Sequence, residues 1–457
     1  MSIKPSLPKG TRDIGPAAML RREFILNHLK TIFKKYGFLP IETPAMENLQ
    51  TLTGKYGEEG DRLIFKVLNS GDFLKKGNKE ALAAENSSAY GKSISDKALR
   101  YDLTVPFARF VSQNQNEVAF PFKRYQIQPV WRADRPQKGR FREFYQCDAD
   151  AIGSSSLWLE LDFIRMYDEA FTALSVPVNI HFNNRKLLAA FAEALKIDDR
   201  LGEFTILLDK LDKIGIEGVI RELEKNNFEP AVGEALKTVL DKEGTNAQKL
   251  DQLEQLIANS PNGPKGLEEV RFVLDKLKAL NLKNNLVLDL SLARGLDYYT
   301  GAIFEVKATN VEMGSIGGGG RYDDLTGIFG LKNISGMGIS FGLDRIQLVM
   351  EELELFPDFK GNSTQVLFLN FGEEEALYSL KLVNALRDKN VKAELYPDAS
   401  KMKKQLDFAN KKQIPYTVMI GSNEIKEGSF AVKNMEDGNQ QKLDEAALIS
   451  FLENLKK

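Results

Sequence analysis

A long helical segment in the middle of the chain lies between two groups of strand-like segments, and this order constrains the fold more than any other feature. Between about 187 and 282, Leu, Glu, Lys and Asp recur at helical spacing. Strand-like segments lie at 122–128 and 141–152 before it, and at 286–290 and 302–307 after it. The order predicts an α+β domain that is interrupted by a helical insertion.

The N-terminal part combines one long helix with shorter segments. Apolar residues recur at helical spacing over 17–36. The segment 39–44 contains two prolines, each of which removes a ladder donor, so it is predicted to be an extended edge. From 56 to 98, short apolar runs alternate with Gly, Asn, Ser and Lys, which predicts hairpins with a polar insertion.

The C-terminal part shows a third pattern. After a linker at 357–363, strand-like segments alternate with helical ones. The strands are expected at 365–370, 392–396 and 416–420, and the helices at 374–387 and 403–413. Strands separated by helices of this length predict a small α/β domain with parallel strand pairs.

Composition excludes several classes of protein. The chain has 62 Lys and Arg against 64 Asp and Glu, so its formal net charge is −2, and any contact with nucleic acid needs a local basic patch. Cys147 is the only cysteine, which excludes an intrachain disulfide and cysteine-based zinc sites of the finger type. His28 and His181 are the only histidines and are expected to be structural, so a Ser-His-Asp mechanism is poorly supplied.

The sequence shows no membrane or export signal. It has no early apolar core of signal-peptide length and no run of about 18 apolar residues. We therefore expect a cytoplasmic protein with no membrane partner.

A run of four glycines, Gly317 to Gly320, invites a nucleotide-loop interpretation, but the standard phosphate-binding motifs are absent. There is no Gly-x-x-x-x-Gly-Lys-Ser/Thr, and 336–342 misses the dinucleotide spacing by one residue, which argues against a nucleotide-binding oxidoreductase. The phosphates of a nucleotide would then be held by side-chain cations. The glycines themselves predict either a ligand floor or a tight turn in an antiparallel sheet.

Arginines are placed where such cations would be needed. Four of them lie in the hairpin formed by the strands at 122–128 and 141–152, and these are also compatible with a solvated, charged hairpin. Two others are surrounded by apolar or glycine-rich sequence, which favours a functional role. The six candidates are Arg132, Arg135, Arg140, Arg142, Arg294 and Arg345.

Five segments, in order along the chain, resemble the signatures of a known family. Residues 131–144, with Trp131-Arg132-Ala133-Asp134 and Arg142-Glu143-Phe144, resemble motif 2 of the class II aminoacyl-tRNA synthetases. Residues 36–44 resemble their motif 1, and 336–345 their motif 3. Residues 294–301 and 318–325 resemble the two histidine-specific motifs of the histidyl-tRNA synthetases.

This resemblance implies a fold and a division of the chain. The fold would be a class II synthetase-like antiparallel sheet flanked by helices, with a helical insertion and a C-terminal α/β domain. The segments would be the first part of a catalytic domain at 1–186, the helical insertion at 187–282, the second part of the catalytic domain at 283–356 and an anticodon-binding domain at 357–457.

The resemblance also implies a reaction. L-histidine would be activated by ATP to histidyl-adenylate with release of pyrophosphate, and then transferred to the 3′ end of tRNA(His). ATP would be a substrate and Mg²⁺ a cofactor. Because the carboxylate of histidine is already a nucleophile, the first step needs positioning and charge stabilisation and no general base.

Roles in ATP binding follow from the same resemblance. Arg132 and Arg294 would be the catalytic residues, which hold the α-phosphate and the substrate carboxylate. Arg140 and Arg345 would hold the γ-phosphate, and adenine would lie between Phe144 and the plane of Arg345. Arg142, two residues beyond Arg140 on a presumed extended strand, would add a phosphate contact.

Histidine binding needs acceptors for the α-ammonium and a polar partner for the ring. Asp102 and Thr104 have the spacing that places both on one face of a strand, and with Gln146 they match the ammonium site of the family. Asp150 and Tyr299 match its imidazole site. The full implied set is Asp102, Thr104, Gln146, Asp150, Arg294, Tyr298 and Tyr299.

The remaining expectations concern macromolecular partners. Arg135, Gln137 and Lys138 would contact the tRNA acceptor end, and the C-terminal domain the anticodon. Motif 1, with an apolar face formed by Phe24, Leu29 and Phe33, implies a homodimer. The alternative function is a non-catalytic synthetase-like regulator or sensor of uncharged tRNA. Such chains are expected to lose the arginines or the anticodon domain, and this chain has both.

Overall fold

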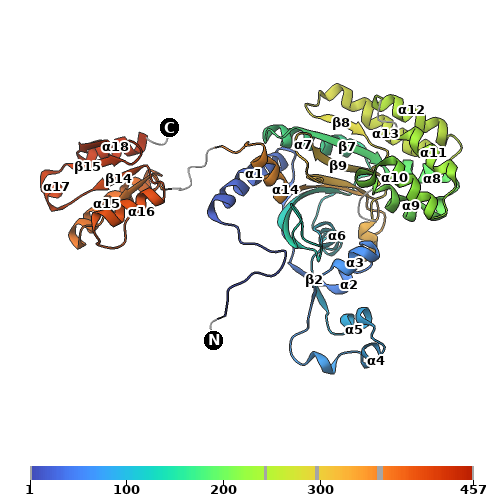
Figure 1. Cartoon of the computed structure of the whole chain (residues 1–457), viewed down its shortest axis with the longest axis horizontal. Coiled ribbons are helices and arrows are strands. Elements are labelled where there is room, and N and C mark those ends of the chain that lie inside the picture. The colour runs from blue at the N-terminus through green and yellow to red at the C-terminus, as the bar shows by residue number, and fades with distance from the viewer. Residues whose placement is uncertain (1–2, 241–243, 294–297, 358–363, 455–457) are drawn as a thin grey trace. The chain divides into compact units, whose positions relative to one another are not determined.

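The computed structural model describes residues 3–240, 244–293, 298–357 and 364–454 (Figure 1). Two compact units are present: one comprises residues 1–14 and 22–355, and the other comprises 15–21 and 356–457. None of the helices in these described stretches is long and apolar enough to cross a membrane.

An eight-stranded sheet forms the centre of the first unit, in the order β1-β5-β6-β11-β10-β9-β7-β8. Its inner strands pair antiparallel, whereas the outer strands β1 and β8 run parallel to their neighbours. The predicted sheet of mainly antiparallel strands is therefore confirmed. The strands are β1 (Leu39–Pro40), β5 (Phe122–Trp131), β6 (Glu143–Ile152), β7 (Val178–Asn184), β8 (Asn285–Leu288), β9 (Ala302–Ala308), β10 (Gly317–Tyr322) and β11 (Gly336–Gly342).

Helices α1 (Pro16–Lys35) and α7 (Trp158–Ala173) pack against one face of this sheet. Phe33 of α1 and Tyr167 of α7 both contact the ring of Phe341 in β11, with ring centroids 5.8 and 4.9 Å away. The helix predicted at 17–36 is confirmed. However, Leu29 and Phe33 are fully buried inside their own chain, so the apolar face that we assigned to a dimer contact packs within the subunit.

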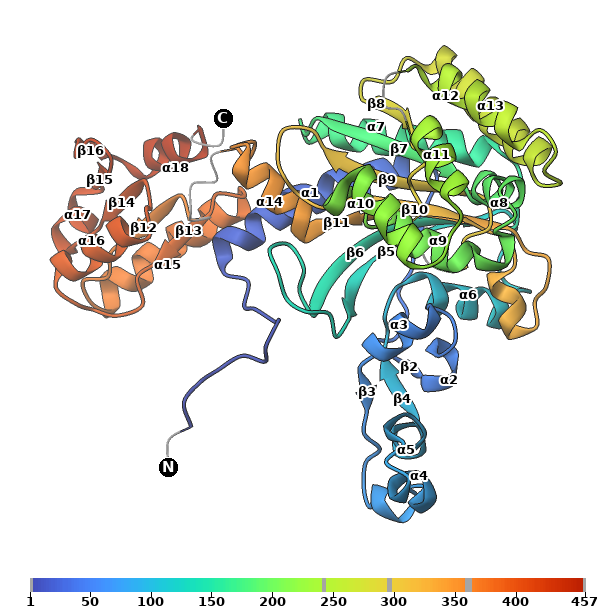
Figure 2. The same ribbon diagram turned by 45° about the vertical axis from the view of Figure 1, so that its right-hand side comes forward.

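The predicted insertion is helical as expected, and Figure 2 shows its helices gathered beside β7 and β8. Its periodic leucines and valines, such as Leu253 and Val270, are buried between helices, which explains the helical spacing in the sequence. The helices are α8 (Arg185–Ala194), α9 (Leu201–Leu208), α10 (Leu211–Lys225), α11 (Pro230–Val239), α12 (Asn246–Ile257) and α13 (Gly263–Leu277), with 3₁₀ turns at Asp198–Arg200 and Lys278–Leu280.

The prediction of hairpins from 56 to 98 is largely wrong. Strands β3 and β4 do pair antiparallel, but short helices lie between them, at the end of a lobe that extends away from the large sheet (Figures 1 and 2). Asn78 and Asn86 cap two of these helices by accepting from the backbone N–H groups of Ala81 and Ala89. The elements are β2 (Met46–Asn48), α2 (Leu49–Leu52), α3 (Gly57–Leu63), β3 (Lys66–Val67), the 3₁₀ turn Phe73–Lys75, α4 (Lys79–Ala83), α5 (Ser87–Ser93), β4 (Lys97–Leu99) and, after the lobe, α6 (Thr104–Gln113).

The four consecutive glycines do not form a turn. Gly317 to Gly320 lie in β10, between β9 and β11, and none of them has a positive φ. A Cβ atom on Gly319 would lie 2.2 Å from the carbonyl oxygen of Gly338 in the next strand. The glycines are needed because the strands approach each other closely at this point. Strand β10 is followed by a 3₁₀ turn (Leu325–Phe329), and β11 is followed by helix α14 (Leu343–Glu352).

The second unit contains a five-stranded sheet in the order β13-β12-β14-β15-β16. Strand β12 runs parallel to β13 and β14, as the alternating pattern predicts. Strands β15 and β16 add an antiparallel edge that the sequence analysis missed. The elements are β12 (Val366–Phe368), α15 (Glu373–Asp388), β13 (Ala393–Leu395), α16 (Met402–Lys411), β14 (Tyr416–Met419), α17 (Ser422–Glu427), β15 (Phe430–Asn434), β16 (Gln440–Leu443) and α18 (Glu445–Asn454).

Candidate active site

A cavity of about 450 Å³ lies in the first unit against the central strands of the large sheet. Side chains from the loop between β5 and β6, from β6 itself and from α14 surround it. Among its lining residues are Arg132, Asp134, Arg140, Phe144, Gln146, Tyr299, Glu305, Gly318, Ser340, Gly342 and Arg345. The cavity thus collects residues that are up to about 200 positions apart in the sequence.

Small residues on adjacent strands form the floor of this cavity. Gly318 of β10 pairs with Ser340 of β11, and Gly342 pairs with Gln146 of β6. A Cβ atom on Gly318 would meet only the Phe304 carbonyl oxygen, at 3.4 Å, and one on Gly342 would meet only the carbonyl group of Ile316, at 3.4 Å or more. The space exists because these strand positions carry little or no side chain, which supports the ligand-floor interpretation of the glycines.

Arg132 and Arg345 both line the cavity. The Nε of Arg132 donates to the carbonyl oxygen of Tyr101 at 3.0 Å, and its guanidinium lies 4.3 Å from the Tyr101 ring and 5.3 Å from that of Phe144. Arg345 donates to the carbonyl oxygens of Gly139 at 3.1 Å and Ser315 at 2.5 Å. Burial, and then nearby Arg140, lowers the pKa of Arg345, as expected where cations converge on an anion site.

Arg142 lies outside the cavity lining. Strand β6 begins at Glu143, and Gln137 and Arg140 pair across a tight turn, so the expectation that Arg140 and Arg142 share a strand face is wrong. The Nε of Arg142 donates to the carbonyl oxygen of Asp134 at 3.2 Å. Its side chain packs on Gly10, where an added Cβ would lie 2.8 Å away, and it therefore supports the loop.

The side chains predicted to contact tRNA lie on the exposed tip of the same loop. Arg135, Gln137 and Lys138 are all exposed, and Lys138 forms an ion pair of 3.0 Å with Glu352. Gly139 and Arg140 line the cavity, so the tip is directly beside it.

Asp102 is buried beside the cavity but does not lie on a strand. It precedes α6 and accepts from the backbone N–H of Val105 at 3.1 Å, in the manner of a helix cap. Its carboxylate also accepts from the hydroxyls of Tyr56 at 2.9 Å and Tyr298 at 3.0 Å. Thr104 is the first residue of α6, so the predicted strand pairing of Asp102 and Thr104 is wrong, although both remain beside Tyr298.

Three polar residues follow each other on one face of β6. Gln146 donates from Nε2 to the hydroxyl of Ser340 at 3.3 Å. Asp150 lies deeper: the Nη2 of Arg124 is 2.9 Å from its Oδ2, and the Tyr322 hydroxyl donates to its Oδ1 at 2.8 Å. Asp148 lies between Gln146 and Asp150, and burial raises its pKa to about 7.

Sequence reasoning missed Arg124, Asp148 and Ser340 as neighbours of the site. The period of two along a strand could have indicated Asp148, because it falls between Gln146 and Asp150. Arg124 and Ser340 come from the adjacent strands β5 and β11, and only the register brings them opposite Asp150 and Asp148.

The histidine-specific segments are only partly described. Tyr299 lines the cavity, and its ring lies edge-on to that of Tyr298. Arg294 lies outside the described residues. His28 and His181 contact the Phe24 carbonyl oxygen and Asp289, respectively, and neither lines the cavity.

Comparison with known proteins identifies the family. The histidyl-tRNA synthetase domain family matches residues 91–346, and an anticodon binding domain matches 365–455. The histidine–tRNA ligase of Christiangramia forsetii is 57% identical over 97% of this chain and 98% of its own length. The chain belongs to the histidyl-tRNA synthetase family. The histidine–tRNA ligase of Flavobacterium johnsoniae is 53% identical over 97% of this chain and 98% of its own.

A solved structure agrees with this assignment. The histidyl-tRNA synthetase of Nostoc sp. PCC 7120 is 28% identical and superposes with a TM-score of 0.81 over 99% of this chain and 100% of its own. The correspondence therefore extends over the whole length of the synthetase.

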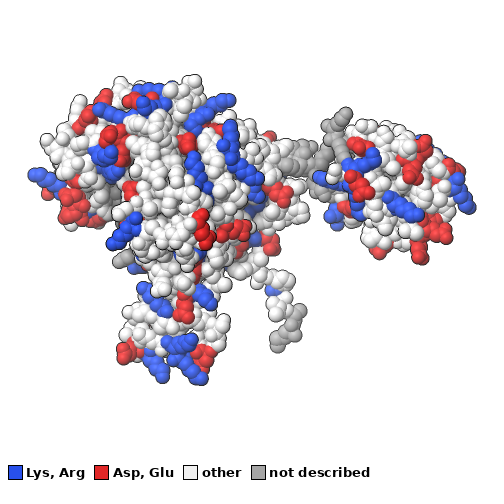
Figure 3. Space-filling view, turned by 180° about the vertical axis from the view of Figure 1, so that it is seen from behind, with Lys and Arg blue, Asp and Glu red and all other residues white. Residues whose placement is uncertain are grey.

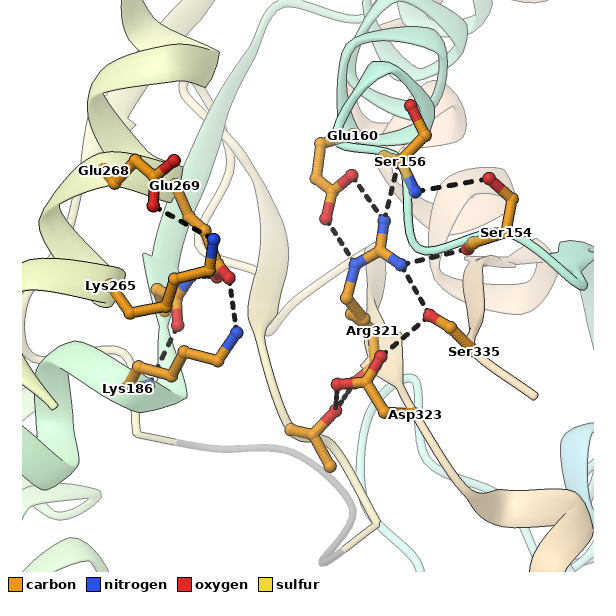
Figure 4. Close-up of polar contacts among 12 residues, drawn as sticks. Ser154, Ser156, Glu160, Lys186, Lys265, Glu268, Glu269, Arg321, Asp323 and Ser335 are labelled. Carbon is orange, nitrogen blue, oxygen red and sulfur yellow. Dashed lines mark hydrogen bonds and ion pairs between the residues drawn. The ribbon is translucent and has the colours of Figure 1, made fainter. Parts of the chain in front are cut away.

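Arg321, in the second histidine-specific motif of this family, does not contact the cavity floor. Figure 4 shows its guanidinium against Glu160 of α7, to which Nε and Nη2 donate at 2.6 and 2.7 Å. Its Nη1 donates to the Ser335 hydroxyl at 2.8 Å, and Ser335 donates to Asp323 at 2.7 Å. Arg321 therefore attaches the sheet to α7 on the face opposite the cavity.

The carboxylates of the cavity fit a magnesium ion that is bound together with phosphates. No group of three or more His, Cys, Asp or Glu side chains able to hold a metal by themselves occurs within the described ranges. Asp344 is paired with Arg12 and Arg22. Asp134 and Glu305 also line the cavity, with Arg140 3.8 Å from Asp134 and Lys307 3.4 Å from Glu305. One or two carboxylates suffice for Mg²⁺ when substrate phosphates supply further oxygen ligands.

Proposed function

We propose that this protein ligates L-histidine to tRNA(His) in two steps. Histidine and ATP form histidyl-adenylate and pyrophosphate, and the histidyl group is then transferred to the 3′ end of the tRNA. One observation carries the proposal: a single cavity over a glycine floor is lined by three arginines, Arg132, Arg140 and Arg345, together with Gln146 and Tyr299.

In the first step the histidine carboxylate attacks the α-phosphate of ATP. Arg132 and Arg294 hold the α-phosphate and the carboxylate, and Arg140 and Arg345 bind the γ-phosphate. Adenine lies between Phe144 and Arg345. Fixed guanidinium groups stabilise the charge that develops at phosphorus without reorganising, which is the main source of catalysis when no proton must be removed.

Mg²⁺ bound with ATP would neutralise part of the charge of the phosphates. Glu305 and Asp134 are the residues of this chain that would hold it, because both line the cavity together with the arginines.

The amino-acid site lies beside Asp102. This carboxylate, with Thr104 and Gln146, binds the α-ammonium, and Asp150 with Tyr299 recognises the imidazole. Tyr298 holds Asp102 through the 3.0 Å hydrogen bond of its hydroxyl. A site with buried polar groups rejects an apolar analogue by about 10⁴- to 10⁵-fold, because those groups would be left unpaired.

The tRNA binds along both units. Arg135, Gln137 and Lys138 contact the acceptor end, and the anticodon-binding domain contacts the anticodon. Lys and Arg are interspersed with Asp and Glu on the face seen in Figure 3, so phosphate contacts must be local. The exposed lysines around α16 supply one such patch: Lys401, Lys403, Lys404, Lys411 and Lys412.

We further propose that the protein is cytoplasmic and, on the basis of motif 1, that it is a homodimer. Leu29 and Phe33 are buried in their own subunit, so other surfaces must form the contact. Light scattering at micromolar concentration should give twice the mass of the chain, and a fully active monomer would contradict the proposal.

ATP–pyrophosphate exchange with each of the twenty amino acids tests the function. Exchange should depend on histidine alone, and aminoacylation should require tRNA(His). A chain that binds tRNA without any exchange would instead be the non-catalytic regulator considered above. The alternative is disfavoured because the described arginines of the site and the anticodon-binding domain are all present.

A further inference from the structure

We propose that Tyr56 is a positioning residue that holds both halves of the active site, Asp102 through its hydroxyl and Arg132 through its ring. Tyr56 lies directly before α3, outside the five signature motifs and N-terminal to the matched family domain at 91–346. The inference rests on the proposed roles of Asp102 and Arg132.

The hydroxyl of Tyr56 orients the Asp102 carboxylate. Three donors from three separate segments converge on Asp102: Tyr56 at 2.9 Å and the Val105 N–H at 3.1 Å reach Oδ1, and Tyr298 at 3.0 Å reaches Oδ2. Asp102 is 1% exposed and Tyr56 is 6% exposed, so water does not replace a missing donor easily.

The same contacts set the protonation of the pair. Burial, and then the charge of Asp102, raises the pKa of Tyr56, so its hydroxyl stays protonated and donates. Burial raises the pKa of Asp102, whereas the bonds from Val105 and Tyr56 lower it. Tyr56 therefore favours the ionised carboxylate that an α-ammonium group requires.

The ring of Tyr56 supports Arg132 indirectly. It packs on the Tyr101 ring with centroids 4.5 Å apart. Tyr101 holds Arg132 twice, through its carbonyl oxygen at 3.0 Å and through its ring at 4.3 Å from the guanidinium carbon. A displaced Tyr56 would let Tyr101 move, and Arg132 would lose its fixed position beside Phe144.

The local sequence explains why Tyr56 fits at this point. A Cβ atom on Gly60, one turn later in α3, would lie 2.4 Å from the Cβ of Tyr56. At its other end α3 is attached to the arginine loop, because the Ala133 N–H donates to the Leu63 carbonyl oxygen at 2.9 Å. Gly60 thus leaves the space that the Tyr56 side chain needs in order to contact Asp102 and Tyr101.

Two substitutions separate the two contacts of Tyr56. Tyr56→Phe keeps the ring and removes the hydroxyl. In pyrophosphate exchange the KM for histidine should therefore rise about tenfold, because a hydrogen bond to a charged group is lost. The KM for ATP and kcat should stay within about twofold. Tyr56→Leu removes the ring as well, so kcat should also fall, by about tenfold or more.

A control is available in Tyr378, whose hydroxyl donates to the Glu445 carboxylate at 3.0 Å. Burial, and then Glu445, raises its pKa, as burial and then Asp102 do for Tyr56, but Tyr378 lies in the second unit and outside the cavity lining. Tyr378→Phe should leave the KM values for histidine and ATP unchanged. This control separates the loss of a tyrosine hydroxyl that donates to a carboxylate from the loss of this one.

The outcomes are distinct. Equal changes in both KM values, or none, in a folded Tyr56→Phe protein would overturn the inference. If that variant does not fold, Gly60→Ala decides: it displaces the whole Tyr56 side chain, so it must both raise the histidine KM and lower kcat for the inference to stand. Failure of the proposed function itself would be seen separately, as absent histidine-dependent exchange in the unaltered protein.

Discussion

Two buried arginines, one on each face of the large sheet, satisfy their hydrogen bonds very differently. Arg321, on the helix-covered face, is 3% exposed and donates to Glu160, Ser335 and two backbone carbonyl groups. Arg124, on the cavity face, is 0% exposed. Its Nη2 contacts Asp150 and the Leu103 carbonyl oxygen, but its Nε and Nη1 have no hydrogen-bond partner among the described residues.

This difference extends to the neighbours of Arg124. Buried Oε1 atoms of Gln126 and Gln146, on the same face, also lack partners in the described part of the chain. An unsatisfied buried polar group costs about 1–3 kcal/mol, so several of them on one face indicate a surface that is completed by a polar ligand. On the helix-covered face, Arg321 finds its partners among the described residues and is therefore expected to contribute stability.

The largest effect is expected from Arg321→Met on the helix-covered face. The substitution leaves the Glu160 carboxylate buried without its partner, and breaking such a pair costs about 3–5 kcal/mol of unfolding free energy. Denaturant unfolding measures the loss, and the KM for histidine should not change in protein that remains folded. A selective rise of that KM would show that the two faces are not functionally separate.

Arg132→Lys should have the next largest effect. Lysine keeps the charge but cannot reproduce the planar guanidinium, so pyrophosphate exchange should fall by about 10²- to 10³-fold. Lys138→Ala, in the same loop but exposed, is the control: exchange should stay nearly intact while aminoacylation weakens. Small, equal effects of both changes would mean that Arg132 is only a solvated loop residue.

Asp150→Asn tests the ion pair on the cavity face. The substitution removes the charge beside Arg124 and the acceptor proposed for the imidazole, so the KM for histidine should rise about 10- to 100-fold, while that for ATP changes little. Glu160→Gln, its counterpart on the other face, should lower stability without this selectivity. Parallel, modest changes in both KM values for Asp150→Asn would place the imidazole elsewhere.

The smallest effects are expected from two neighbouring glycines that belong to opposite faces. Gly318→Ala adds a methyl group to the cavity floor, so substrate affinity should fall by less than about tenfold with stability unchanged. Gly319→Ala forces a Cβ atom against the Gly338 carbonyl oxygen and should destabilise the fold by about 1–3 kcal/mol. Thermal unfolding together with exchange kinetics distinguishes the two, and reversed results would show that the floor is wrongly placed.

Local pattern determined much of the fold. The helix at 17–36, the two strands around the arginine loop, the helical insertion and the parallel strands of the C-terminal unit were all predicted from periodicity, because each pattern reflects neighbours within a few residues. The motifs also indicated Arg132, Arg140, Phe144, Gln146, Tyr299 and Arg345, and the structure places these six around one cavity.

Contacts between distant segments decided the rest. The spacing of Asp102 and Thr104 fits a strand and the start of a helix equally well. The helix start forms because Asp102 accepts hydrogen bonds from the Val105 N–H and from the hydroxyls of Tyr56 and Tyr298. The four glycines fit a turn as well as a strand until β9 and β11 pair with them.

The partners of buried charges were likewise invisible in the sequence. Glu160 pairs with Arg321 from 161 positions away, and Arg124 faces Asp150 only through the register of β5 and β6. The sequence by itself determined which elements form and which residues could carry the chemistry. The tertiary structure decided which of those residues meet, because a side chain's partner across a sheet is set by strand order and register, and no local periodicity encodes either.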